Sequence, residues 1–269
     1  MMRRDEALHP RSDRSAGFTL VEVIVVIGII AFLVALLLPG IRSAQESAKK
    51  AVCLSNLRQI GFAIQTYANA NRGSIPYGPK APPVFSATDF YPSTGAPTSL
   101  ISLKSGKPVG IGLLLQPYLD NQQRALFCPS PDQPISADAE LAKVGVSQAQ
   151  GSYYYRHGSM TNLYDPPGVP MPLSDYTRLS NLGKNREGVK IRALVMDSMF
   201  LAHPSLAMFS ITSRTHHRQR FTNILYSDGH TESRANADRR YTVSMQDYAA
   251  AINGFNLILH AFELADRDN

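Results

Sequence analysis

The feature that most constrains this chain is an apolar run of 21 residues near its N-terminus, Phe18 to Leu38, FTLVEVIVVIGIIAFLVALLL. At about 1.5 Å per residue, a helix of this length spans about 31 Å, which matches the hydrocarbon core of a bilayer. The run is longer than the apolar core of a secretory signal, and no small-x-small cleavage site closes it. It therefore predicts one membrane-spanning helix.

Glu22 is the single charge in this run. A carboxylate one turn inside an apolar helix is costly unless it has a partner, so we expect Glu22 to have a function. Basic residues stand on both sides of the run, so charge counting leaves its orientation open: Arg3, Arg4, Arg11 and Arg14 precede it, and Arg42, Lys49 and Lys50 follow it.

The six residues from Gly17 to Glu22, GFTLVE, resemble the type IV prepilin motif G-F-T-L-x-E. The resemblance implies that residues 1–17 are a cytoplasmic leader, that a prepilin peptidase cuts between Gly17 and Phe18, and that Phe18 is then N-methylated. It also implies a single-pass protein of the bacterial inner membrane. The remainder of the chain would be periplasmic, or extracellular after assembly.

The resemblance gives Glu22 a partner. Cleavage creates an ammonium group at Phe18, and in a stack of subunits with an axial offset Glu22 of one copy meets that group on its neighbour. Each buried charge is then paired and the register is selected. The alternative is an unpaired carboxylate that is tolerated near the membrane surface.

The helix is predicted to continue after the membrane segment. Apolar residues recur at helical spacing from Ile41 to Ala68, and the stretch from Asn69 to Gly73, NANRG, predicts its end. Pro39 lies where prepilin-like helices bend and carry on. The alternative is two helices joined by a hinge at Pro39-Gly40. The predicted parts are thus 18–38 in the membrane, 39–70 as an amphipathic half, and 71–269 as a globular domain.

The globular part predicts a small antiparallel sheet. Strands are expected over 151–156, 191–197 and 220–227, with Asp228-Gly229 as a hairpin turn and a returning strand over 230–233. We expect a long loop region over 71–110, a short helix or turn over 112–119, a strand end over 126–130 and a helix over 243–262. The fold class is α+β: a long N-terminal helix packed on an antiparallel sheet, as in pilins.

A second resemblance covers this half of the chain. The stretch from Cys53 to Gly61, CLSNLRQIG, is similar to a C-x-x-N-L-x-Q-I-G element in prepilin-like proteins of unassigned role. Such proteins also carry a C-P-S, here at Cys128, and a histidine element before a D-G-H, here His216-His217 before Asp228. In this chain the spacing from histidine to aspartate is one residue longer than in that family, and about forty residues follow.

The two cysteines, Cys53 and Cys128, have no C-x-x-C spacing, so a zinc or redox motif made of cysteines alone is excluded. On the oxidising side of the membrane they could form a disulfide that ties the helix to the sheet domain. The alternative is a buried free thiol that acts as a small hydrophobic group.

Four histidines and two aspartates could supply metal ligands, but no fixed spacing supports a site: His203, His216, His217, His230, Asp197 and Asp228. Asp197 and Asp228 are the candidate calcium ligands. The favoured alternative is turn chemistry at Asp228-Gly229 with surface histidines, and we expect no cofactor. No phosphate-binding loop, nucleophile elbow or dinucleotide fingerprint is present, so we expect no enzyme.

The net charge of +6 is mild, and the nearest basic cluster, Arg214 to Arg220, is short, so no nucleic acid partner is expected. The first functional hypothesis is a pilin or pseudopilin subunit whose partners are the prepilin peptidase, the inner membrane and other pilins, including copies of itself. The alternative is a membrane-tethered envelope binding module with an exposed cluster from Tyr153 to Tyr155. A tethered metal enzyme would need Asp197, Asp228 and at least two histidines to converge.

Overall fold

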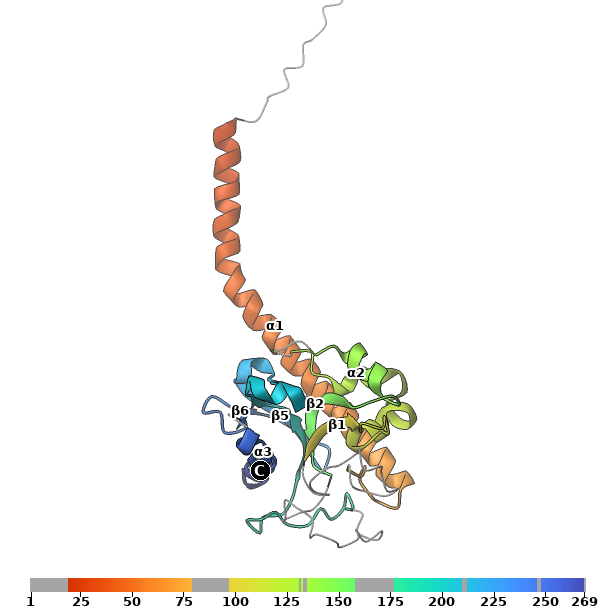
Figure 1. Ribbon diagram of the computed structural model, residues 1–269. Helices are drawn as coiled ribbons and strands as arrows, with labels where there is room; N and C mark the ends of the chain where they lie inside the picture. Colours follow the sequence, from red (N-terminus) through yellow and green to blue (C-terminus); the bar gives the residue numbers. More distant parts are fainter. Residues whose placement is uncertain are drawn as a thin grey trace, which may run out of the picture. The chain divides into compact units, whose positions relative to one another are not determined.

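The computed structural model describes residues 19–78, 97–130, 132, 135–157, 177–209, 212–245 and 248–268 (Figure 1). The chain forms two compact units, residues 1–45 and 46–269. Gly17 and Phe18, at the predicted cleavage site, lie outside the described residues.

Helix α1, Leu20–Ala70, is continuous through Pro39 and is 51 residues long. It does not divide into two helices at Pro39-Gly40, although Pro39 lacks the N–H that would bond to the preceding turn. The predicted end is confirmed: the Gly73 N–H donates to the Ala68 carbonyl at 2.7 Å, and Arg72 and Gly73 have positive φ angles of 56° and 84°.

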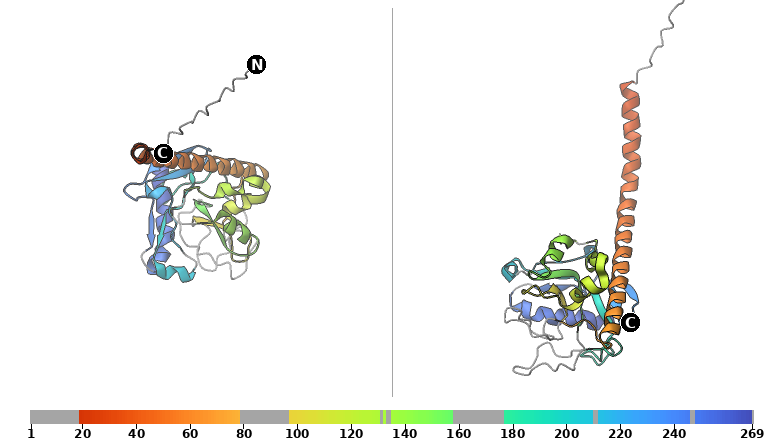
Figure 2. Two further views of the ribbon diagram at one scale, coloured as in Figure 1. Left: turned by 90° about the horizontal axis from the view of Figure 1, so that it is seen from above. Right: turned by 90° about the vertical axis from the view of Figure 1, so that its right-hand side faces the viewer.

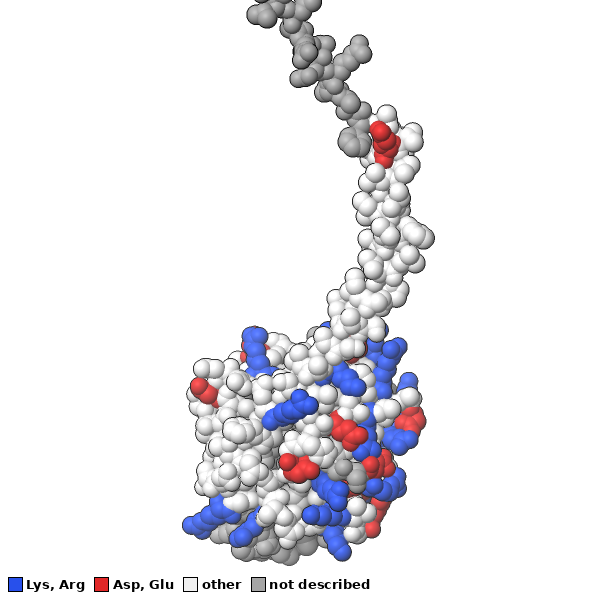
Figure 3. All heavy atoms as spheres, turned by 180° about the vertical axis from the view of Figure 1, so that it is seen from behind, with Lys and Arg blue, Asp and Glu red and all other residues white. Residues whose placement is uncertain are grey.

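The first unit is the N-terminal part of α1. All its described side chains, from Thr19 to Gln45, are exposed. Between Leu20 and Ile41 Glu22 is the one charged side chain, so this part of α1 presents an apolar surface (Figure 3). A helix that is apolar all round requires lipid or other helices to cover it.

The second unit is built on a five-stranded sheet with every neighbouring pair antiparallel, which confirms the α+β class. The strands in sheet order are β1 (Thr98–Ser102), β2 (Ala149–Tyr155), β3 (Ala193–Asp197), β5 (Phe221–Tyr226) and β6 (Thr231–Ala235). The predicted hairpin joins β5 to β6, with Gly229 at a positive φ of 91° in the turn.

Two local predictions were wrong, and a third left one strand unlocated. Residues 243–245 form strand β7 (Val243–Met245), parallel to β4 (Phe200–Ala202), and helix α3 begins only at Tyr248 and ends at Arg267. Strand β1 lies inside the loop region predicted over 71–110, which was expected to hold short elements that the sequence does not reveal; residues 79–96 of that region lie outside the described residues. Residues 126–130 form no strand: Leu126 ends the short 3₁₀ helix η4 (Asp120–Leu126), and the chain bends at Phe127 and Pro129.

The remaining elements are short. Helix α2 spans Ala137–Lys143, and single helical turns are η2 (Gly110–Leu114), η3 (Leu115–Leu119), η5 (Pro204–Phe209) and η6 (His217–Gln219). The predicted short helix over 112–119 corresponds to η2 and η3.

Alternating side chains place the two long helices on opposite faces of the sheet (Figures 1 and 2). Tyr153 and Tyr155 of β2 pack in one cluster with the buried face of α1, which begins at Cys53. Tyr154 points to the other face, where it packs in one cluster with Phe262 of α3. The second unit therefore has three layers: helix, sheet and helix.

Candidate functional site

The start of α1 is capped by three reciprocal hydrogen bonds between Thr19 and Glu22. The Thr19 backbone N–H and its hydroxyl donate to Glu22 Oε2 at 2.8 and 2.7 Å, and the Glu22 N–H donates to Thr19 Oγ1 at 3.2 Å. This is the capping-box arrangement, T-x-x-E, which satisfies two backbone donors at a helix start. This capping role of Glu22 was not predicted, although the T-x-x-E spacing of Thr19 and Glu22 is its signal in the sequence.

Among the described residues α1 is the one helix long and apolar enough to cross a membrane, and it lies near the N-terminus. Its exposed apolar residues begin at Leu20 and include Phe32, which is 64% exposed. This apolar part of the helix, in which Glu22 at the third helical position is the one acid between Leu20 and Ile41, can therefore both span a bilayer and present a carboxylate to a neighbouring helix.

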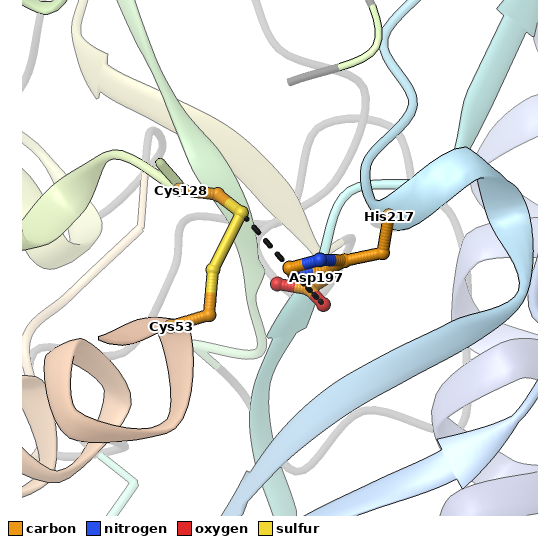
Figure 4. A group of neighbouring side chains, drawn as sticks. All are labelled: Cys53, Cys128, Asp197 and His217. Atoms are coloured by element: carbon orange, nitrogen blue, oxygen red, sulfur yellow. Dashed lines mark hydrogen bonds and ion pairs between the residues drawn. A yellow bond between two sulfur atoms is a disulfide. The ribbon is translucent and has the colours of Figure 1, made fainter. Parts of the chain in front are cut away.

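A second cluster lies in the interior of the second unit, where Cys53 of α1 and Cys128 form a disulfide with a Cα–Cα separation of 5.5 Å (Figure 4). This separation lies in the range found for disulfides. The Tyr153 hydroxyl contacts Cys53 Sγ at 3.7 Å, and Cys128 Sγ lies 3.3 Å from His217 Nε2.

His217 is fully buried between this disulfide and two acids. Its Nδ1 lies 3.2 Å from Glu46 Oε1, and its Nε2 lies 3.8 Å from Asp197 Oδ2. Burial lowers the pKa of His217 below its ordinary value, while the nearby Glu46 opposes the shift. The ring also stacks on Phe221, with centroids 4.5 Å apart.

Asp197, the last residue of β3, is buried as well. Its Oδ2 accepts hydrogen bonds from the Asn223 N–H and side-chain amide, both at 2.8 Å. Burial raises the pKa of Asp197 to about 7, and the Asn223 hydrogen bonds oppose the shift. The neighbouring His216 is buried too, and burial lowers its pKa to about 3.

The other predicted metal candidates are not in this cluster. Asp228 lies in the exposed β5–β6 turn, where it accepts from the His230 N–H at 3.1 Å and pairs with its ring at 2.6 Å. Among the described residues, the one group with metal-ligand spacing is Cys53, Cys128, Asp197 and His217. The metal-enzyme hypothesis required Asp197, Asp228 and at least two histidines to converge. In the described residues this group contains Asp197 without Asp228, and His217 is its one histidine.

The surfaces that two alternative functions would need are not found in the described part of the chain: an exposed aromatic cluster for an envelope binding module, and a basic surface for nucleic acid. Tyr153, Tyr154 and Tyr155 are buried, at most 5% exposed, so they form no exposed aromatic cluster. Arg214 is buried and donates to the Gly151 carbonyl at 3.2 Å, so it adds little to a basic surface.

Comparisons with known proteins agree with the N-terminal features. Residues 12–38 match the family model of the prokaryotic N-terminal methylation motif. No curated protein and no solved structure matches the chain. The match covers the predicted cleavage site and the apolar half of α1, and leaves the second unit unmatched. The methylation motif runs into the long apolar helix α1, the one described helix able to span a membrane, and this combination is consistent with a membrane-anchored type IV prepilin-like protein.

Proposed function

We propose that this protein is a structural subunit, cut by a prepilin peptidase after Gly17 and assembled through α1 into a type II secretion pseudopilus or a type IV pilus-like filament. The observation that carries the proposal is one acid, Glu22, on an exposed apolar helix within the matched motif. Burial against other helices replaces burial in lipid, so the membrane form and the assembled form cover the same surface.

The domain lies on the periplasmic side in this proposal. The Cys53–Cys128 disulfide supports that placement, because disulfides persist in oxidising compartments and are rare in the cytoplasm. The role is structural rather than enzymatic. Pro39, which lies within α1, allows the helix to adjust locally where neighbouring helices pack.

The capping box gives Glu22 two separable roles. In the single chain its carboxylate closes the helix start through Thr19. In the filament it would pair with the Phe18 ammonium of a neighbouring subunit. A neutral glutamine at this position still serves a capping box, but it cannot pair with an ammonium as an ion.

Three variants distinguish these roles. Glu22→Gln keeps the cap and removes the charge, Glu22→Ala removes both, and Thr19→Val removes the hydroxyl and keeps the charge. We expect Glu22→Gln and Glu22→Ala to lower the yield of sheared filaments by at least about tenfold, because an unpaired buried ammonium costs several kcal/mol. Thr19→Val should assemble at a yield near that of the wild type.

The measurement is the sheared filament fraction relative to total processed protein, with processing followed by the mass of the N-terminus. A loss of assembly in Thr19→Val equal to that in Glu22→Ala would assign Glu22 to capping alone. Normal assembly of Glu22→Gln would refute the charge pairing.

The burial of Tyr153, Tyr154 and Tyr155 counts against the alternative, a membrane-tethered envelope binding module. Calcium remains a prediction without support here, since it needs about six to eight oxygen ligands and Asp197 and Asp228 lie in different surroundings.

A further inference from the structure

Four side chains from four segments meet in the interior of the second unit (Figure 4). Cys53 comes from α1, Cys128 from the segment after η4, Asp197 from β3 and His217 from η6. Their ligand atoms all lie within 4.8 Å of one another, and all four residues are buried. Ligand atoms around tetrahedral zinc lie about 3.3–3.8 Å apart, so small movements would complete such a site.

The histidine is oriented as a metal ligand would be. Its Nε2 faces Cys128 Sγ at 3.3 Å and Asp197 Oδ2 at 3.8 Å, while Nδ1 contacts Glu46 Oε1 at 3.2 Å. Metal-ligating histidines commonly donate the second ring N–H to a carboxylate, which fixes the tautomer. With the proton on Nδ1, Nε2 is the acceptor of this ring. The Asn223 side-chain nitrogen lies 3.2 Å from Nε2, so a bound metal would take the place of that hydrogen bond.

The aspartate has a free acceptor in the same place. Asp197 Oδ2 accepts two hydrogen bonds from Asn223, whereas Oδ1 has no hydrogen-bond partner among the described residues. Among the residues that the structure describes, no Lys or Arg nitrogen lies within 4 Å of the Asp197 carboxylate. Buried carboxylates are ordinarily paired with a cation or coordinate a metal.

The backbone that carries the histidine is strained. His217, Arg218 and Gln219 have φ angles of 53°, 53° and 58°, a left-handed turn without glycine. Asp132 Oδ1 holds this turn by accepting from the Arg218 N–H at 2.8 Å. Each such residue costs about 1–3 kcal/mol, and strain of this kind concentrates at functional sites. Here the strained turn carries the His217 side chain into the cluster.

We propose that, in the dithiol state, Cys53 and Cys128 bind one Zn²⁺ together with His217 Nε2 and the Asp197 carboxylate. Binding converts two thiols to thiolates and releases two protons, with no transfer of electrons. The disulfide and the zinc site are mutually exclusive, because a sulfur in a disulfide is not a thiolate ligand. Thiolate and imidazole ligands favour zinc over calcium.

The zinc site is separate from the proposed filament role. All four ligands lie in the interior of the second unit, so metal binding can be tested whether or not the chain assembles. The two cysteines of a newly exported chain can therefore be linked in either of two ways: by oxidation to the disulfide, or by binding one Zn²⁺.

The first test uses the full chain in detergent. The protein is reduced with excess phosphine, freed of reductant without oxygen, and titrated with Co²⁺ and then Zn²⁺. We expect one Co²⁺ per chain, with thiolate-to-cobalt charge-transfer absorption and the strong visible bands of a tetrahedral site, and displacement by one equivalent of Zn²⁺. The oxidised chain should show neither band. Absence of the bands after reduction, or equal binding by the oxidised chain, would overturn the proposal.

The second test uses variants. Asp197→Asn and His217→Gln should each weaken Zn²⁺ binding by at least about tenfold in a competition with a chromophoric chelator. His230→Gln is the matched control, because it removes an exposed imidazole that also pairs with an aspartate, and it should bind like the wild type. Unchanged affinity in Asp197→Asn, or a loss in His230→Gln equal to that in His217→Gln, would contradict the assigned ligands. The cobalt spectrum of the wild type decides the matter if a ligand variant fails to fold.

Discussion

Arg156 and Asp266 form an ion pair that is almost completely shielded from water, with side chains 1% and 0% exposed. Arg156 Nη1 lies 2.7 Å from Asp266 Oδ2, and the other oxygen accepts from the Arg192 and Ala193 N–H groups at 2.8 and 2.9 Å. Asp266 lies on α3 and its partners lie on and beside the central strands, so this carboxylate joins the helix to the sheet.

Removing this acid should destabilise the fold strongly. In Asp266→Ala the Arg156 guanidinium stays buried without its counter-ion, and we expect the free energy of unfolding to fall by about 3–5 kcal/mol. Urea unfolding of the detergent-solubilised chain, followed by circular dichroism, measures the change.

Asp138→Ala is the control for that measurement. Asp138 pairs with Arg124 at 2.8 Å, but the side chains are 71% and 74% exposed. Exposed pairs contribute about 0–1 kcal/mol, so this variant should unfold close to the wild type. Equal losses in the two variants would show that burial of the Arg156 pair is not what matters.

At the residue scale the sequence was informative where the functional residues are contiguous. The prepilin motif places Gly17, Phe18 and Glu22 within six positions, and a contiguous pattern needs no tertiary information. The buried cluster joins Cys53, Cys128, Asp197 and His217, which are far apart along the chain, and packing alone brings them together. No spacing rule in one sequence could have selected Asp197 over Asp228.

At the element scale, strands with aromatic, apolar or alternating runs were predictable and shorter strands were not. Strands β2, β3 and β5 coincide with β-prone runs in the sequence. The Asp228-Gly229 turn signal correctly predicted the hairpin of β5 and β6. The sequence predicts helix where strand β7 lies, because Val243 and Met245 continue the apolar spacing of α3. Its partner β4 lies about forty residues earlier, and a parallel pairing at that distance leaves no local signal.

Helix α3 should depend on one aromatic side chain. Phe262 is fully buried on the sheet face opposite α1, and its ring lies 5.6 Å from the Arg156 guanidinium. Phe262→Ala removes this packing and leaves a cavity, so we expect a loss of about 3–5 kcal/mol in the free energy of unfolding.

The same substitution on α1 provides the control. Phe62 is 76% exposed, so Phe62→Ala should change the free energy of unfolding by no more than about 0.5 kcal/mol. A comparable loss in both variants, read by hydrogen exchange of α3 amides and by urea unfolding, would mean that Phe262 does not anchor the helix.

At the scale of the whole molecule, the proposed processing would divide the chain into a leader and a mature protein. In cells with an active prepilin peptidase we expect the purified protein to begin at Phe18 and to carry one added methyl group on its amine. Intact-mass spectrometry with N-terminal peptide mapping measures both.

Cells that lack the peptidase are the control, and in them the chain should keep residues 1–17. An intact leader in peptidase-positive cells would contradict processing at Gly17, whatever the state of the second unit.

The cross-link between Cys53 and Cys128 has a mechanical consequence. Cys53 is the first buried residue along α1, so in a filament of the proposed kind tension along the helix would reach a covalent bond before it reached the buried side chains that follow. The cross-link also lowers the entropy of the unfolded chain, which for a separation of 75 residues stabilises the folded state by about 4 kcal/mol. A subunit dragged out of the bilayer by its stalk would therefore bring its head along intact, because peeling the two apart requires breaking a sulfur–sulfur bond.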